Sequence, residues 1–196
     1  MTDSHPHVPT LARQLADIAH WVEEKARDLP PMFRPAASET ELAEAERQLG
    51  LPLPPMLRAL YAIADGQTEG AATLLDAFAW MPLSEVVERA AFLNEFFPDG
   101  INEEDPDHEP MQVDPGIRAT WWWPQWLPIM ANGGGDYLCV DLDPAPGGQP
   151  DQVLAYFHDE TYRNLVAPGI EVLIESVATG LANGTFDLMD GMLCEA

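Results

Sequence analysis

Three consecutive glycines, at positions 133–135, lie between two short apolar segments and constrain the fold more than any other feature. Glycine destabilises a helix interior, yet it adopts the positive φ angles of tight turns without strain. Residues 127–130 before the glycines are apolar, and apolar side chains alternate over residues 138–142 after them, as in a strand with one buried face. Residues 126–144 are therefore predicted to form a strand, a glycine loop and a second strand.

Apolar residues recur at helical spacing elsewhere in the chain. The predicted helices are residues 10–28, 38–49, 54–65, 84–97 and 169–183, and further strands are expected at 77–81 and 152–157. Ser38 and Glu41 have the spacing of a capping box, and Ser84 is expected to cap a later helix. Helices come first, then strands joined by short loops, then a helix. This order favours an α+β fold with a largely antiparallel sheet over a doubly wound parallel one.

The length and composition indicate a single domain. At 196 residues and 46% hydrophobic composition, the chain can bury one substantial core. We expect this domain at residues 38–186, with an acidic loop inserted at residues 95–116. An N-terminal helix and a proline-rich connection precede it at residues 1–37, and a weakly patterned tail follows at residues 187–196. The sequence has no apolar run of the roughly 18 residues that a membrane span needs and no leader pattern, so a cytoplasmic protein without a membrane partner is expected.

The charge of the chain limits its partners. It has 33 Asp and Glu against 9 Lys and Arg, a formal net charge of −24. Nucleic acid is not an expected partner, because binding to it depends largely on Lys and Arg contacts with phosphates. A basic protein is expected instead, since an acidic field steers cationic proteins toward it. The alternative, that acidity only keeps the protein soluble, stays open. The predicted partner-binding acids are Glu103, Glu104, Asp105 and Asp107 in the inserted loop.

Four of the six tryptophans lie within residues 121–126. In an extended segment Trp122 faces opposite to Trp121 and Trp123, so at least one indole is expected near the surface. We predict Trp122 as an exposed anchor for a partner, with core packing as the alternative, and Trp126 as a core residue.

Motifs for catalysis or cofactor binding have little support. A phosphate-binding loop needs a Lys after its glycines, whereas Asp136 follows them here. Asp141, Asp143 and His158 could serve a metal-dependent hydrolase, but the sequence offers no converging cluster of histidines around them. We therefore expect no catalytic residue, metal or cofactor, and keep such a hydrolase as a minor alternative.

Two motifs, in this order, resemble those of the SUKH superfamily, in its Smi/Knr-like branch. The first comprises Leu49-Gly50, Leu51-Pro52 and Asp65-Gly66, and the second comprises Trp126-Leu127-Pro128, Gly133-Gly134-Gly135-Asp136, Leu138 and Asp141. Asp65 stands where the family has Asn. The resemblance covers residues 39–186, which leaves the N-terminal helix and the acidic loop as additions.

The resemblance implies a non-enzymatic α+β domain with a central sheet packed by helices. It assigns structural roles to Leu51, Pro52, Gly66, Trp126, Pro128, Gly134, Gly135, Asp136 and Asp141. Many bacterial relatives are immunity proteins that neutralise toxins, often nucleases or deaminases, and an acidic immunity protein is the main expectation for this chain. The fungal branch implies an alternative, a regulatory or scaffold protein that binds an endogenous partner in cell-wall assembly or proliferation. The sequence does not indicate an oligomeric state.

Overall fold

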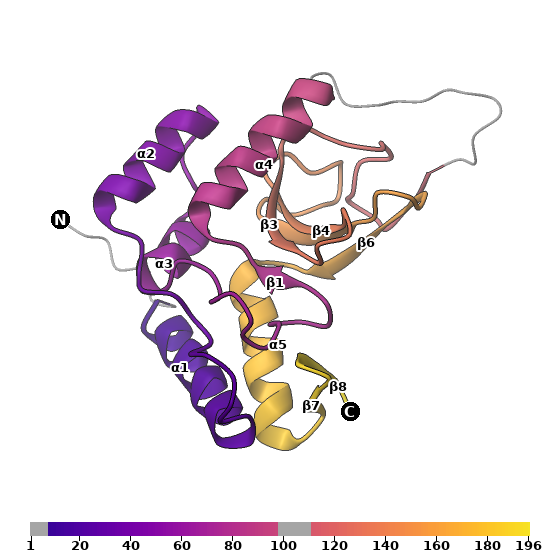
Figure 1. The fold of residues 1–196 in the computed structure, drawn as a ribbon. Helices are drawn as coiled ribbons and strands as arrows, with labels where there is room; N and C mark the ends of the chain where they lie inside the picture. The colour runs from indigo at the N-terminus through magenta and orange to yellow at the C-terminus, as the bar shows by residue number, and fades with distance from the viewer. Residues whose placement is uncertain (1–7, 98–110) are drawn as a thin grey trace.

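A computed structural model of the chain describes residues 8–97 and 111–196. Its elements are α1 (Val8–Lys25), α2 (Glu39–Leu49), α3 (Pro55–Ile63), β1 (Ala79–Trp80), α4 (Leu83–Phe96), β2 (Gln112–Val113), β3 (Trp126–Ala131), β4 (Tyr137–Asp141), β5 (Gln152–Tyr156), β6 (Tyr162–Ala167), α5 (Ile170–Asn183), β7 (Phe186–Met189) and β8 (Met192–Glu195). Within the described residues, five helices surround a six-stranded sheet, and a two-stranded hairpin lies at the C-terminal end (Figure 1). The predicted α+β class is confirmed.

The large sheet has the strand order β1-β3-β4-β5-β6-β2. Strands β3 to β6 form an antiparallel meander, β1 adds an antiparallel edge, and the pairing of β2 with β6 is parallel. The predicted hairpin across residues 126–144 is therefore confirmed as β3 and β4, and the predicted strand at 152–157 as β5. The register shifts between Pro128 and Met130 in the β3–β4 pair, beside a residue that has no N–H to donate to a ladder.

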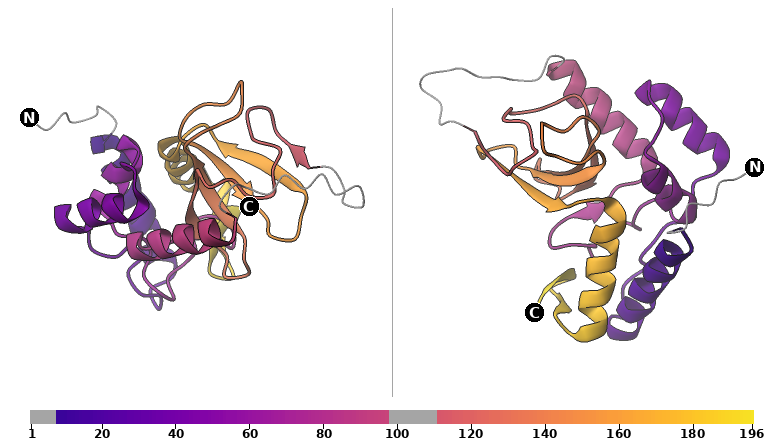
Figure 2. Two further views of the ribbon diagram at one scale, coloured as in Figure 1. Left: turned by 90° about the horizontal axis from the view of Figure 1, so that it is seen from above. Right: turned by 180° about the vertical axis from the view of Figure 1, so that it is seen from behind.

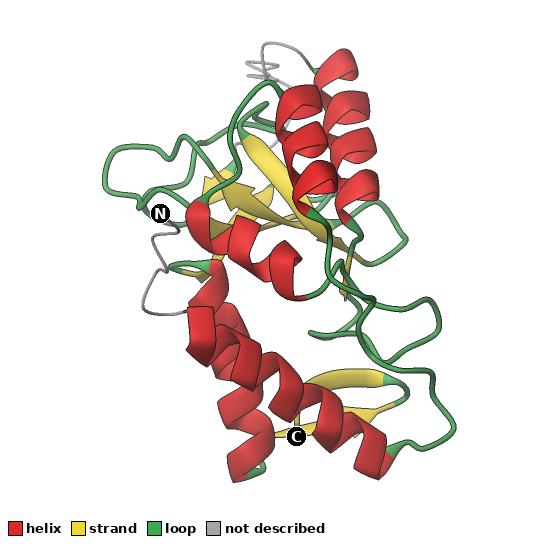
Figure 3. Cartoon of the chain, turned by 90° about the vertical axis from the view of Figure 1, so that its left-hand side faces the viewer, coloured by secondary structure: helices red, strands yellow, loops and turns green. Residues whose placement is uncertain are grey.

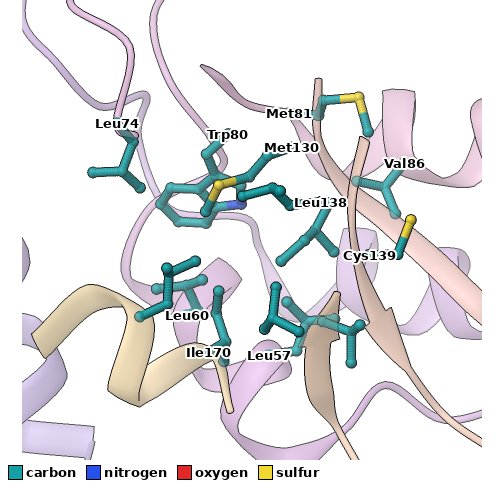
Figure 4. Close-up of a cluster of buried hydrophobic side chains, with 14 of the residues drawn as sticks. Leu57, Leu60, Leu74, Trp80, Met81, Val86, Met130, Leu138, Cys139 and Ile170 are labelled. Carbon is teal, nitrogen blue, oxygen red and sulfur yellow. The ribbon is translucent and has the colours of Figure 1, made fainter. Parts of the chain in front are cut away.

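Helices cover both faces of this sheet (Figures 1 and 2). Helix α4 packs against β3, whereas α5 packs against β5 and β6 and is itself covered by α1 and α3. Figure 4 shows Leu138 close to Met130 and above Leu57, whereas the next residue, Cys139, lies near Val86 of α4. The two faces thus bury alternate residues of one strand, which explains why every residue of β4 is buried.

The predicted N-terminal cap is present at helix α2 but not at helix α4. Ser38 and Glu41 form the predicted capping box of α2, with the Ser38 N–H donating to Glu41 Oε2 at 2.7 Å. The predicted Ser84 cap is wrong, because α4 begins at Leu83. The Leu83 N–H donates instead to Asp65 Oδ1 at 2.8 Å, so a carboxylate from the end of the preceding helical region satisfies this helix terminus.

The C-terminal segment is more ordered than its weak pattern predicts. Residues 186–195 form the β7–β8 hairpin, and its turn places Asp190 and Gly191 at φ angles of 51° and 82°. The Thr73 N–H donates to the Gly191 carbonyl at 2.9 Å, and the Leu193 N–H donates to the Thr73 carbonyl at 3.1 Å. The tail predicted at residues 187–196 is thus bonded to the loop before β1.

The predicted acidic insertion at residues 95–116 includes parts of two regular elements. Glu95 lies in α4, and Gln112 and Val113 form β2. The predicted partner-binding acids Glu103, Glu104, Asp105 and Asp107 lie outside the described residues. In the parts of the chain that are described, no helix has the length and apolar character that crossing a membrane requires.

Candidate functional site

The glycine loop between β3 and β4 is closed by the chain's own side chains. Gly133 and Gly135 have φ angles of 77° and 111°, as predicted for a hairpin loop rather than a ligand cradle. Asn132 Oδ1 accepts hydrogen bonds from the N–H groups of Gly134, at 2.8 Å, and Asp136, at 3.2 Å. Its amide nitrogen donates to Asp136 Oδ2 at 2.6 Å. The backbone donors that could bind a phosphate are therefore partly used within the loop.

Asp136 connects this loop to the turn after β5. Its Oδ1 accepts hydrogen bonds from the His158 N–H at 3.0 Å and from His158 Nδ1 at 2.8 Å. A Cβ on Gly135 would lie 3.1 Å from the imidazole ring, a tight contact, and the φ angle of 111° also favours glycine here. We call Asn132, Asp136 and His158 the glycine-loop clamp, because together they join two loops of the sheet.

The clamp overlaps a possible metal-ligand group. Ligand atoms of Asp136, His158 and Asp159 lie within 4.8 Å of one another. Both Asp136 oxygens and His158 Nδ1 already take part in hydrogen bonds, and a cation would have to displace them. The donor set therefore fits a structural role better than an open metal site.

The clamp makes stability depend on pH. The hydrogen bond to Asp136 raises the pKa of His158 above its ordinary 6.5, and the negative charge of Asp159 adds to this effect. Because the folded-state pKa is raised, the contribution of His158 is fully present below the unfolded-state pKa and is lost as the pH rises through the folded-state value. We expect the His158→Gln variant to lose more stability, relative to wild type, at about pH 5.5 than at about pH 8.5.

An NMR titration of the His158 ring checks the cause. The pKa of His158 should lie above 6.5 in wild type and move back toward that value in Asp136→Asn. An identical titration in both proteins would show that Asp136 does not hold the imidazolium.

The structure does not bring the hydrolase candidates together. Asp141 is fully buried, where its oxygens accept hydrogen bonds from Gln152 Nε2 at 3.0 Å and the Asp143 N–H at 3.2 Å. Burial raises the pKa of Asp141, although these hydrogen bonds oppose the shift. His158 pairs instead with Asp136. Asp136 and Asp141 lie at opposite ends of the five-residue strand β4, and an extended strand of this length separates them by roughly 16 Å. Asp141 therefore orders the β4–β5 connection and shares no site with His158.

The prediction that Trp122 is an exposed partner anchor is wrong. Its side chain is 0% exposed and makes edge-to-face contacts with Trp126 and Tyr156, at ring-centroid distances of 5.9 and 5.2 Å. Trp122 Nε1 also donates to Asn94 Oδ1 of α4 at 3.0 Å. The alternation was predicted correctly, since the neighbouring indoles of Trp121 and Trp123 are only half-buried.

The remaining motif residues occupy structural positions. Leu51 is half-buried and Pro52 is exposed in the turn between α2 and α3, where the next residue, Leu53, fills the core. Gly66 has a φ angle of 77° and lies against the backbone of Met81, which leaves no room for a side chain. Trp126 is 1% exposed, as predicted.

The acids of α2 and α4 frame a groove. These two helices lie side by side at the outside of the molecule (Figures 1 and 3). The space between them is about 430 Å³ and is lined by Arg34, Thr40, Glu41, Glu44, Ala45, Gln48, Asp65, Leu83, Ser84, Val87 and Glu88. We call it the acidic groove, because four carboxylates and one guanidinium line it. Sequence reasoning missed this site, although Glu41 and Glu44 lie three residues apart, a spacing that puts both on one face of a helix.

Much of the positive charge of the chain is already paired. Arg47 bonds to Glu44, Arg58 to Glu39 and Arg118 to Asp143. Arg163 is fully buried, and its guanidinium donates to backbone carbonyls, including that of Trp121 at 2.9 Å. These arginines leave little free positive charge to offset the surplus of acids.

Comparison with known proteins gives three fungal relatives. The cell wall assembly regulator SMI1 of Saccharomyces cerevisiae is 22% identical over an alignment of 222 residues. This alignment covers 96% of this chain and 44% of that protein. The cell wall biosynthesis/cell cycle regulator smi1 of Schizosaccharomyces pombe is 24% identical, with 90% of this chain and 37% of the relative covered. A glucan synthesis regulatory protein of Neurospora crassa is 26% identical, with 91% and 40% covered.

The chain therefore spans less than half the length of the curated relatives it matches. The sequence profile of the SMI1 / KNR4 family (SUKH-1) matches residues 36–176, most of the chain and both motifs up to the middle of α5. Together with the two motifs and the α+β architecture, this match shows that the chain belongs to the SMI1 / KNR4 family (SUKH-1).

Proposed function

We propose that this chain is a regulatory protein-binding domain whose partner is a cationic protein. The observation that carries the proposal is the acidic groove, which lies on the outside of a chain with a formal net charge of −24. Opposite charge accelerates the encounter of two proteins and discriminates against partners of the same charge. The same charge disfavours nucleic acid.

The roles for which the three relatives are named favour regulation over toxin neutralisation. All three are regulators of cell-wall assembly, cell-wall biosynthesis or glucan synthesis. Neutralisation of a basic toxin uses the same surface chemistry and stays a prediction. The neighbouring gene separates the two roles, since an adjacent gene for a secreted toxin supports immunity and its absence supports regulation of an endogenous partner.

The proposal predicts a salt-dependent association. The partner should be recovered from the native host, purified separately and mixed with the full chain. We expect its association rate to fall by about tenfold or more between roughly 50 mM and 500 mM salt, because exposed charges are screened within a few Å at the higher concentration. Stopped-flow fluorescence measures this rate. A stoichiometric partner whose association is insensitive to salt, or whose net charge is negative, would contradict the proposal.

A further inference from the structure

We infer that the acidic groove binds a Lys- or Arg-bearing segment of the partner protein, with the aliphatic stem of the basic side chain on its floor and the cationic head between α2 and α4. This inference rests on the proposed function and narrows it to one surface and one kind of ligand. Three features of the groove support it: an apolar floor, an acidic rim and one carboxylate that is not engaged.

The floor of the groove is apolar. Ala45 of α2 and Leu83 and Val87 of α4 line it, and all three side chains are at least 90% buried. A carbon-rich floor favours a ligand with apolar atoms. Lys and Arg supply such atoms, because their methylene stems lie along apolar surfaces while their charged heads stay in water.

The rim of the groove is acidic on both helices. Glu41 and Glu44 come from α2, and Glu88 comes from α4. All three residues are exposed, so a cationic head could reach them without complete desolvation. Carboxylates on opposite walls suit a guanidinium or an ammonium, which can bond to both.

Most of the groove's acids are held by the protein itself. Glu41 accepts the capping bonds of Ser38, and Glu44 pairs with Arg47. Glu88 has no hydrogen bond or ion pair within residues 8–97 and 111–196. Glu88 is therefore the carboxylate most available to a ligand, and the internal bonds of the other two fix the rim in place.

The same lining argues against other ligands. Four carboxylates and a single guanidinium repel an anion. A bare divalent cation would compete with the bonds to Ser38 and Arg47, and it would make no use of the apolar floor. A basic side chain with an aliphatic stem uses both the floor and the rim. The volume of about 430 Å³ lies within the range of ordinary ligand pockets.

Binding of a defined peptide tests the inference. The probe is a fluorescein-labelled 18-residue peptide with Leu and Arg at helical spacing, and fluorescence anisotropy gives its affinity for the full chain. We expect the double variant Glu44→Gln/Glu88→Gln to weaken binding at least about tenfold. Ser84→Trp, which fills the groove from an exposed position of α4 without changing the charge, should weaken binding to a similar extent. A second peptide with Gln in place of every Arg should not bind.

A control pair separates the groove from overall charge. Glu24→Gln/Glu175→Gln removes the same charge from exposed positions on α1 and α5 and should change affinity less than about twofold. Equal losses in the two double variants, unchanged binding by Ser84→Trp, or no binding by wild type would each overturn the inference. If the native partner binds the groove variant as tightly as wild type but stays sensitive to salt, the groove assignment fails and the proposed function stands.

Discussion

Gly66→Ala is expected to lower the free energy of unfolding by roughly 2–5 kcal/mol, a large effect for a single methyl group. Gly66 has a φ angle of 77°, and this conformation costs alanine about 1–2 kcal/mol. An added Cβ would also lie 2.6 Å from the Pro82 nitrogen and 2.7 Å from the Met81 carbonyl carbon. Both contacts are with backbone, which cannot rotate away, so overpacking adds about 1–3 kcal/mol.

Gly70→Ala is the matched control. Gly70 has nearly the same φ angle, 79°, but an added Cβ there would meet no atom within 4 Å. Only the backbone cost of about 1–2 kcal/mol should remain. Urea unfolding of both variants measures the difference. Equal losses of stability would mean that Gly66 does not lie against the start of α4 as described.

Trp122→Ala is expected to destabilise the fold by roughly 3–5 kcal/mol, the usual cost of removing a buried large aromatic side chain. The indole is completely buried, contacts two other aromatic rings and ties α4 to the tryptophan segment through Asn94. Its removal leaves a cavity and leaves Asn94 Oδ1 without the hydrogen bond that Trp122 donates. Because domains are stable by only about 5–15 kcal/mol, this loss should be obvious in thermal or urea unfolding.

The neighbouring variant Trp123→Ala should cost less than half as much. Trp123 is half-buried, and the guanidinium of Arg118 covers its ring at 4.4 Å. The folded fraction of Trp122→Ala should bind its partner as wild type does, since no part of the indole is exposed. A stable Trp122→Ala protein that has lost partner binding would restore Trp122 as a surface anchor.

Local signals predicted much of the fold because they act within a few residues. Ser38 and Glu41 form the capping box that their three-residue spacing predicts. Gly133 and Gly135, before Asp136, take the positive φ angles that the hairpin loop requires. The α+β class followed from the order of these elements. One local signal was overlooked: Asp190-Gly191 is a common hairpin turn between two short apolar segments, and it forms the β7–β8 turn.

Contacts between distant residues could not be predicted in this way. Asp65 satisfies the N-terminus of α4 from 18 residues away, and this contact removes the need for the predicted Ser84 cap. Asp136 and His158 are 22 residues apart and meet because β4 and β5 are neighbours. The alternation of residues 121–123 predicted that Trp122 faces opposite to its two neighbours. Which of the two faces is buried depends on the packing of α4, and this could not be read from the alternation.

The net charge predicted an acidic surface but not its location. The sequence directed attention to the acidic loop, whereas Glu41 and Glu44 of α2 and Glu88 of α4 line a groove with an apolar floor. Which carboxylates remain available depends on the internal pairs, such as that of Glu44 with Arg47. That pair lies three residues apart within α2, whereas the groove itself forms only when α2 and α4 pack together.

Zero-length carbodiimide coupling of the full chain with its native partner, followed by mass spectrometry, tests the central claim most directly. This reaction joins a carboxylate to an amine, and the chain has one lysine, Lys25, so most linkages at its acids must report lysines of the partner. We expect Glu88 and Glu44 to be joined to lysines of a cationic protein, with the linkages lost at high salt. Linkages that avoid α2 and α4 and persist at high salt would contradict the account.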